Sequence, residues 1–167
     1  AYACLSPRTT LEALGDFAER LDYDVVTFDA VDRDGTPVYH TNVLMNVGEK
    51  TAVICAEAIP DNDQRAAMLA RLCSTGHEVI EITMEQVNAF AGNMLALRSA
   101  AGNRVIAMSG QARNSLDNDQ LAALERVATI VSAPIEHIES SAGGSVRCML
   151  AEIHLPREAT ASAVTTT

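Results

Sequence analysis

The residues most able to do chemistry lie in a small-residue loop that runs into an apolar segment near the end of this 167-residue chain. Gly143 and Gly144 permit backbone angles that other residues avoid, so a bound molecule can approach the backbone closely. Cys148 follows as a candidate nucleophile, Ser145 adds a hydroxyl group, and Arg147 adds a positive charge that favours the thiolate. A lone cysteine is usually a small apolar side chain, and Gly-Gly-Ser is usually a plain loop. On these residues alone, the structural interpretation is the stronger one.

Two further segments add to the Cys148 loop. Residues 37–48 read Pro-Val-Tyr-His-Thr-Asn-Val-Leu-Met-Asn-Val-Gly, and residues 90–95 read Phe-Ala-Gly-Asn-Met-Leu. Together with that loop they occur in the order found in the guanidino-group-modifying enzymes, which the chain resembles. This superfamily includes arginine deiminase, dimethylarginine hydrolase and the amidinotransferases, and the likeness is strongest to the arginine-deiminase-related branch called citrulline utilization hydrolases. It runs from Tyr2 to about Pro156, and three motifs in order make it more specific than any single motif.

The resemblance implies that Cys148 is a nucleophile and that His40 is its general acid and base. Resonance makes the C–N bond of a guanidino or ureido group difficult to break, so a soft nucleophile and a proton shuttle are needed. The thiolate would attack the central carbon, an amine or ammonia protonated by His40 would leave, and water activated by His40 would release the adduct. No metal and no cofactor are expected. Papain-like peptidases have their cysteine first, so the order His40 before Cys148 disfavours that class.

Without the resemblance, His40 would be interpreted as a core or surface histidine. The residues expected to contact the substrate, or to shape its site, are Asn42, Gly92, Asn93, Ser145 and Arg147. Arginine deiminases have an aspartate at the position of Asn42, and its carboxylate holds the guanidinium ion. A neutral amide suits a neutral ureido compound such as citrulline at least as well as arginine. Gly92 and Asn93 are expected to line the mouth of a channel or to fix the His40 segment, although a buried asparagine that only caps a turn fits equally well.

Hydrophobic spacing and cap signals predict the elements that hold these residues. Thr9 with Glu12 and Thr83 with Gln86 have capping-box spacing, and Asp61 begins a helix that Gly76 stops. Helices are expected from these caps and from Asp117, ending near Leu21, Ser74, Phe90 and Val127. Strands are expected at Tyr2–Leu5, Val25–Phe28, Val43–Val47, Thr51–Cys55, Val79–Ile82, Met94–Arg98, Val105–Met108, Thr129–Val131 and Val146–Leu155.

The order hairpin, helix, strand therefore occurs twice, after a partial copy of helix and strand. Such a repeat of a ββαβ unit predicts an α/β protein with a radial or stacked arrangement. The resemblance implies a pentein-type five-unit α/β propeller, of which residues 1–156 form only a part, corresponding to the C-terminal half of the family domain. A second chain or a clipped upstream half, or a homo-oligomer, is expected to complete the ring, because missing units leave open sheet edges. The superfamily's other substrate-holding acids are expected in that upstream half.

Composition limits the partners and the compartment. A formal charge of −10 and a pI of about 4.7, without a basic patch, make nucleic acid and anionic membranes poor partners, whereas a cationic substrate fits the sign. Cys4, Cys55 and Cys73 lie in apolar segments and are expected to be core thiols, which suits a reducing cytoplasm. The absence of a Cys-x-x-Cys pair excludes zinc-ribbon spacing. No apolar run approaches the ~20 residues of a membrane helix.

One competing class is a non-catalytic propeller protein that serves as a binding module or scaffold. Matching motifs around both His40 and Cys148 argue against it, because a scaffold needs neither. The acidic run Asp29, Asp32 and Asp34 lacks the glycine and glutamate of a calcium-binding EF-hand loop and is expected to be solvated. The side chains expected to be structural or exposed are His77, His137, His154 and Glu152. The segment 157–167 is expected to be a disordered tail.

Overall fold

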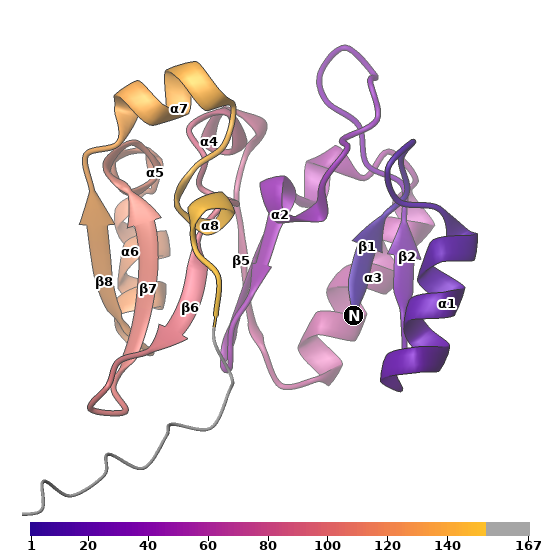
Figure 1. Ribbon diagram of the computed structural model, residues 1–167, viewed down its shortest axis with the longest axis horizontal. Coiled ribbons are helices and arrows are strands. Elements are labelled where there is room, and N and C mark those ends of the chain that lie inside the picture. The colour runs from indigo at the N-terminus through magenta and orange to yellow at the C-terminus, as the bar shows by residue number, and fades with distance from the viewer. Residues whose placement is uncertain (153–167) are drawn as a thin grey trace, which may run out of the picture.

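The computed structural model describes residues 1–152, which form three small sheets with helices packed around them (Figure 1). The strands are β1 (Tyr2–Cys4), β2 (Val26–Phe28), β3 (Met45–Val47), β4 (Thr51–Ile54), β5 (Glu78–Glu81), β6 (Leu95–Arg98), β7 (Arg104–Ser109) and β8 (Thr129–Ala133). The helices are α1 (Leu11–Leu21), α2 (Thr41–Leu44), the 3-10 helix η1 (Ala56–Ala58), α3 (Asn62–Ser74), α4 (Met84–Asn88), α5 (Gly110–Ser115), α6 (Asn118–Glu125), α7 (Glu136–Ala142) and α8 (Val146–Met149).

The predicted internal repeat is confirmed. In the sheets β3-β4-β5 and β6-β7-β8, the first pair of strands is antiparallel and the second pair is parallel. Helix α3 joins the parallel pair of one sheet, and α5 with α6 joins that of the other. Both strands predicted on either side of the first helix are present, and β1 pairs in parallel with β2 across α1, so the partial copy also begins with a strand.

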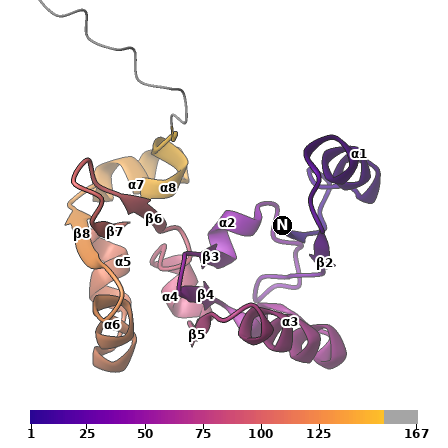
Figure 2. The same cartoon turned by 90° about the horizontal axis from the view of Figure 1, so that it is seen from below.

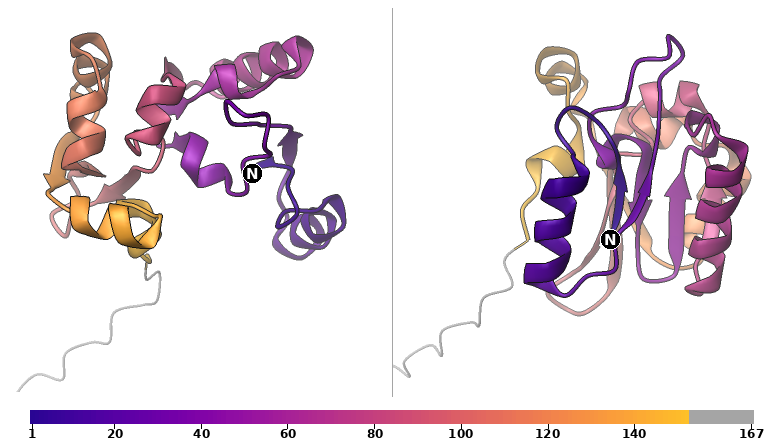
Figure 3. Two further views of the ribbon diagram at one scale, coloured as in Figure 1. Left: turned by 90° about the horizontal axis from the view of Figure 1, so that it is seen from above. Right: turned by 90° about the vertical axis from the view of Figure 1, so that its right-hand side faces the viewer.

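The three sheets lie along an arc (Figure 2). Helices α1, α3 and α6 lie on its outer side, whereas α2 lies on its inner side. Viewed from above, the segment containing α7 and α8 lies at the opposite end of the arc from α1 (Figure 3). The shared core is apolar and includes both hairpin sheets, with Leu44, Ile54, Met94 and Met108 almost fully buried. Helix α2, on the inner side of the arc, therefore packs through Leu44 against the same apolar core as both hairpin sheets.

Most of the predicted helix starts are confirmed by their caps. The carboxylates of Asp61 and Asp117 each accept a hydrogen bond from the backbone N–H three residues on, at 2.8 Å. Thr83 forms the predicted capping box at the start of α4. The predicted Thr9–Glu12 box is wrong, since Thr10 caps α1 and accepts from Ala13 N at 3.2 Å. Thr9 is instead bridged to the residues before it through backbone hydrogen bonds with Ser6.

Three other predictions are wrong in ways that have physical reasons. Val43 and Leu44, predicted to begin a strand, belong to α2, and Val146–Met149 forms α8 instead of the start of a closing strand. A short apolar run fits a half-buried helical turn as well as a strand, so periodicity could not separate them. Cys73 is exposed because α3 buries Met68 and Leu72, and the next residue is rotated by about 100° around the helix. His154, the end of the predicted closing strand and the predicted tail lie outside the described residues.

The predictions for Cys4, Cys55, His77 and His137 agree with the structure. Cys4 and Cys55 are buried, as expected of core thiols. His77 is half-buried between the Thr75 hydroxyl and the Gly48 carbonyl, and His137 is exposed. In residues 1–152, no helix combines the length and the apolar composition that crossing a lipid bilayer requires.

Candidate active site

His40 is the residue immediately before helix α2, and Asn42 lies in the first turn of that helix. His40 is the N-cap residue with extended backbone, its side chain makes no capping bond, and it is exposed. Its ring stacks at a tilt on the ring of Tyr39, with centroids 4.4 Å apart. The helix is attached to the first sheet, because the Thr41 hydroxyl accepts a hydrogen bond from Cys4 N at 3.0 Å. The imidazole is thus presented to solvent from an anchored backbone.

The turn that contains Gly92 and Asn93 packs directly against α2. A Cβ atom on Gly92 would lie 2.2 Å from the carbonyl oxygen of Val43, a contact that no side chain permits. Phe90 takes a left-handed φ of 64° to make this turn, and its carbonyl accepts from Asn93 N at 2.9 Å. The Asn93 side chain then donates to the Asn42 carbonyl at 3.0 Å. The structure therefore brings the segment 37–48, which contains His40, into contact with the segment 90–95.

The Cys148 thiol completes this cluster from α8. Its Sγ lies 3.3 Å from Asn93 Nδ2 and 3.7 Å from Asn42 Nδ2, within hydrogen-bonding reach for sulfur. Asn93 is only 2% exposed, whereas Cys148 is exposed. Two amide donors therefore approach one accessible sulfur atom, and Asn93 Oδ1 also lies 3.6 Å from it.

The glycine loop before α8 shapes the space around Cys148. Gly143 ends α7 with a left-handed φ of 67°. A Cβ atom on Gly144 would lie 3.1 Å from the Cβ of Cys148 and 3.4 Å from its Sγ. Gly143 is thus needed for its left-handed backbone conformation, and Gly144 for the close approach of the backbone to Cys148.

Ser145 and Arg147 are placed differently from one another. Ser145 is 0% exposed and donates its hydroxyl to Glu139 Oε1 at 2.6 Å. Arg147 is half-buried and donates to the Met45 carbonyl at 3.1 Å, which ties α8 to β3. Burial lowers the pKa of the Arg147 guanidinium from its ordinary value, while the nearby Cys148 and Glu152 act to raise it. Ser145 thus faces a buried carboxylate in this structure, and Arg147 a backbone carbonyl.

The structure therefore joins Asn42, Gly92, Asn93 and Cys148 in one cluster, whereas His40 stands beside it. Within residues 1–152, no hydrogen bond links His40 to Cys148. Sequence reasoning missed Glu139, a residue of α7 that is only 5% exposed. No three His, Cys, Asp or Glu side chains in the described part of the chain come together as a metal site would require.

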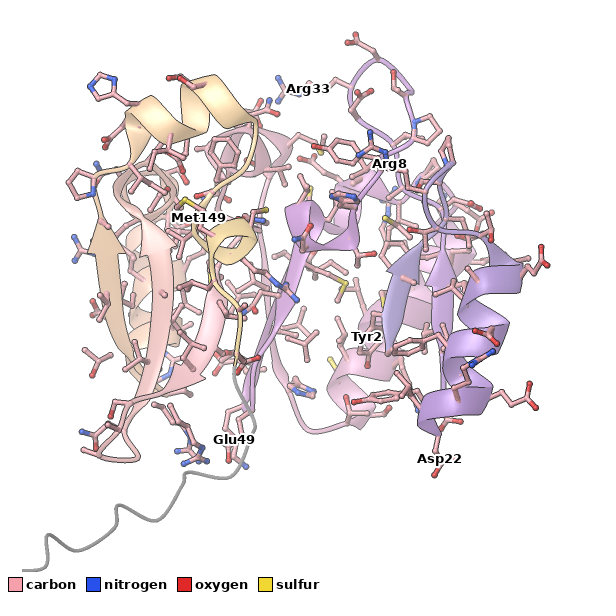
Figure 4. All side chains as sticks on the ribbon, in the orientation of Figure 1. Tyr2, Arg8, Asp22, Arg33, Glu49 and Met149 are labelled. Carbon is pink, nitrogen blue, oxygen red and sulfur yellow. The ribbon has the colours of Figure 1, made fainter. Side chains whose placement is uncertain are left out.

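A separate cavity of about 750 Å³ lies between the hairpin β3–β4 and the hairpin β6–β7, next to Leu150–Glu152. Glu49 lines it and pairs with Arg98 and Arg104. Figure 4 shows Met149 of α8 toward one end of the sheets and Glu49 at the other. The cavity lining does not include Cys148, so cavity size and chemistry point to different places. We place the candidate site at Cys148, because two amide donors converge there on a nucleophilic atom.

Solved structures share this fold. The N-terminal domain of ArgZ, an arginine dihydrolase from Cyanobacteria, bound to product, matches with 19% identity over 89% of this chain and 49% of that chain, with a TM-score of 0.67. AgrE in ternary complex with ornithine and NAD+ matches with 17% identity over 95% of this chain and 21% of that chain, with a TM-score of 0.69. The chain thus spans about half the length of the ArgZ domain and about a fifth of AgrE.

These matches give the chain the mixed α/β fold of the pentein-type arginine-modifying enzymes. No curated protein sequence matches it significantly. The sequence model of the family described as N,N dimethylarginine dimethylhydrolase, eukaryotic, matches residues 1–155. The chain belongs to that family.

Proposed function

We propose that this chain carries the nucleophile of a metal-free hydrolase that cleaves a C–N bond of a ureido or guanidino compound. The observation that carries the proposal is the approach of the Asn42 and Asn93 amides to the exposed Cys148 sulfur at 3.7 and 3.3 Å. Membership of the dimethylarginine dimethylhydrolase family and the fold shared with arginine dihydrolases support this reaction class.

The proposed reaction uses the Cys148 thiol and the imidazole of His40, the residue that precedes α2. The Cys148 thiolate attacks the central carbon, a carbon–sulfur bond forms, and the carbon–nitrogen bond breaks. His40 gives the departing nitrogen its proton, then takes a proton from the water that cleaves the carbon–sulfur bond. The exposed position of His40 at the start of α2 is compatible with this shuttle, since a bound substrate can lie between it and the thiol.

The substrate is proposed to be a neutral ureido compound of the citrulline type. Asn42 Oδ1 is buried and has no hydrogen-bond partner within the described residues, although its Nδ2 faces Cys148. A buried acceptor without a hydrogen bond destabilises the folded protein, and an N–H of the substrate beside the thiol would supply that bond. A neutral amide gains less from a guanidinium ion than a carboxylate does, which favours the ureido compound.

Asn93 and Gly92 are proposed to hold this substrate site in shape, and Arg147 to hold α8 against β3. Ser145 is proposed to help shape the substrate site, because it is the residue immediately before α8, the helix that carries Cys148. We also propose that residues 1–156 are the C-terminal half of a five-unit α/β propeller. An upstream segment, a second chain or another copy would then supply the remaining units, which agrees with the chain spanning about half of the ArgZ domain.

The test is labelling of the full protein with 2-chloroacetamidine, followed by turnover of citrulline, arginine and dimethylarginine. We expect rapid modification of Cys148 and loss of turnover in Cys148→Ala. Cys73→Ala is the matched control, because Cys73 is also exposed but lies on the distant α3. Full turnover by a folded Cys148→Ala protein would refute the nucleophile. A strong preference for arginine would refute the ureido substrate, and absence of both labelling and turnover would favour a non-catalytic binding protein.

A further inference from the structure

The carboxylate of Glu139 is buried beside the segment that carries Cys148. Glu139 lies on α7, is 5% exposed, and accepts a hydrogen bond from Ser145 Oγ at 2.6 Å. Ser145 is itself 0% exposed, so this bond is shielded from water. An O···O distance of this length is at the short end of the range for O–H···O hydrogen bonds. The pair therefore links α7 firmly to the residue that precedes α8.

Ser145 transmits this link to the cysteine. It occupies the N-cap position of α8 with φ −125° and ψ −159°, yet its side chain makes no capping bond to that helix. The hydroxyl is used on Glu139 instead, while the Ser145 carbonyl accepts a hydrogen bond from Cys148 N at 3.0 Å. Glu139 thus sets the position of the first residue of the turn that ends in the Cys148 thiol.

This arrangement is expensive as a purely structural device. Glu139 Oε2 is buried and has no hydrogen-bond partner within residues 1–152. A buried carboxylate whose second oxygen is unpaired destabilises the folded state, and an uncharged side chain would anchor a loop at less cost. Such costs are tolerated mainly where function requires a fixed geometry. Ser145 lies three residues before Cys148 along the chain, so the pair is placed to act on that cysteine.

We propose that Glu139 is a positioning residue for Cys148, acting through Ser145. Its hydrogen bond holds α8 so that the sulfur stays within reach of the Asn93 amide. This inference rests on the proposed role of Cys148 as nucleophile. It predicts that the length and hydrogen-bonding capacity of the side chain matter at position 139, and that its charge does not.

The experiment measures the rate of Cys148 modification by 2-chloroacetamidine across a pH range in the full protein. Glu139→Gln keeps the length and the acceptor oxygen, so its rate should stay within about threefold of the parent. Glu139→Ala and Glu139→Asp lose the bond, because the first has no acceptor and the second is one methylene too short. We expect both to react on the order of 10-fold more slowly. The slower rate should persist across the pH range, because a displaced sulfur atom loses the Asn93 donor.

Two further variants separate positioning from a general loss of structure. Ser145→Ala should slow labelling as much as Glu139→Ala, and the double variant should be no slower than either, since the two residues act as one unit. Glu136→Ala is the matched control, because Glu136 is an exposed acid on the same helix. Thermal melting of every variant shows which of them remain folded.

The outcomes are distinct. A folded Glu139→Ala protein with the parent rate and pH profile would overturn the proposal, as would slow labelling of Glu139→Gln with normal labelling of Glu139→Asp, which would assign the role to charge. If Glu139→Ala does not fold, the comparison of Glu139→Gln with Ser145→Ala decides the question in the same way. Failure of the parent protein to label selectively at Cys148 would instead refute the proposed function itself.

Discussion

Replacement of Gly92 by alanine should destabilise the protein and displace α2. A Cβ at this position would meet the Val43 carbonyl oxygen at 2.2 Å and backbone carbons of Val43 and Leu44 at 2.9 Å. Ordinary contact begins near 3.4 Å, so the two backbones must separate by about 1.2 Å. No change of rotamer can relieve the clash, because every atom that the new methyl group meets belongs to the main chain.

The expected magnitude follows from that geometry. Inserting a methyl group into a packed interior usually costs about 1–3 kcal/mol, and a backbone obstacle places this site near the upper value. For a domain of this size, about 3 kcal/mol lowers the melting temperature by roughly 6–12 °C. Movement of α2 away from Asn93 should also slow modification of Cys148, because Asn42 and Asn93 approach the sulfur together.

Thermal unfolding followed by circular dichroism measures the effect, and Gly15→Ala provides the control. Gly15 lies within α1, and a Cβ there would have no atom within 4 Å. The same chemical change should therefore stabilise the protein by about 0.5–1 kcal/mol at that position. If Gly92→Ala melts within about 2 °C of the parent protein, the close approach of the two backbones is not a constraint and our reasoning about α2 fails.

Three other perturbations have defined outcomes. Arg104 hydrogen-bonds to Glu49 and lowers the pKa of that carboxyl from 4.5 to about 2. Glu49→Gln should therefore be less stable than the parent protein above pH 4.5, and this difference in the free energy of unfolding should vanish as the pH falls to about 2. Urea unfolding at several pH values measures the difference, and a difference that does not change with pH would contradict the prediction. Asp117→Ala should cost about 1 kcal/mol through loss of the α6 cap, and an unchanged urea midpoint would count against it. Burial raises the pKa of Cys55 to about 11, so iodoacetamide at pH 8 should modify Cys73 in the folded protein and reach Cys55 only on unfolding; equal rates by peptide mass mapping would exclude this.

The sequence predicted those elements whose signals are local. The carboxylates of Asp61 and Asp117 satisfy backbone donors three residues away, so each cap depends only on its own segment. The two hairpins were also predictable, because turn residues and alternating apolar residues determine them within a few positions. The repeat was visible for the same reason, since both copies use the same cap before the helix of the unit.

What the sequence could not predict depends on tertiary packing. Residues 146–149 form α8 because that segment packs against β7 and is tied to Met45, which no local pattern encodes. The burial of Glu139 could not be predicted either, since an acidic residue in a surface-like helix is normally solvated. The motif residues Asn42, Asn93 and Cys148 were identified in advance, but their mutual approach became visible only through the contact between α2 and the Gly92 turn.

The contacts that hold α8 have a consequence for the order in which the chain folds. Its partners Asn42, Asn93 and Met45 lie 106, 55 and 102 positions from the residues they meet, whereas each hairpin closes within a few residues. Long loops are slow to close, so α8 should dock after both hairpin sheets have formed. It should also be among the first segments to detach when the native protein opens locally. A molecule with intact sheets and a detached α8 would look folded by most spectroscopic measures, yet its thiol would have left both amides.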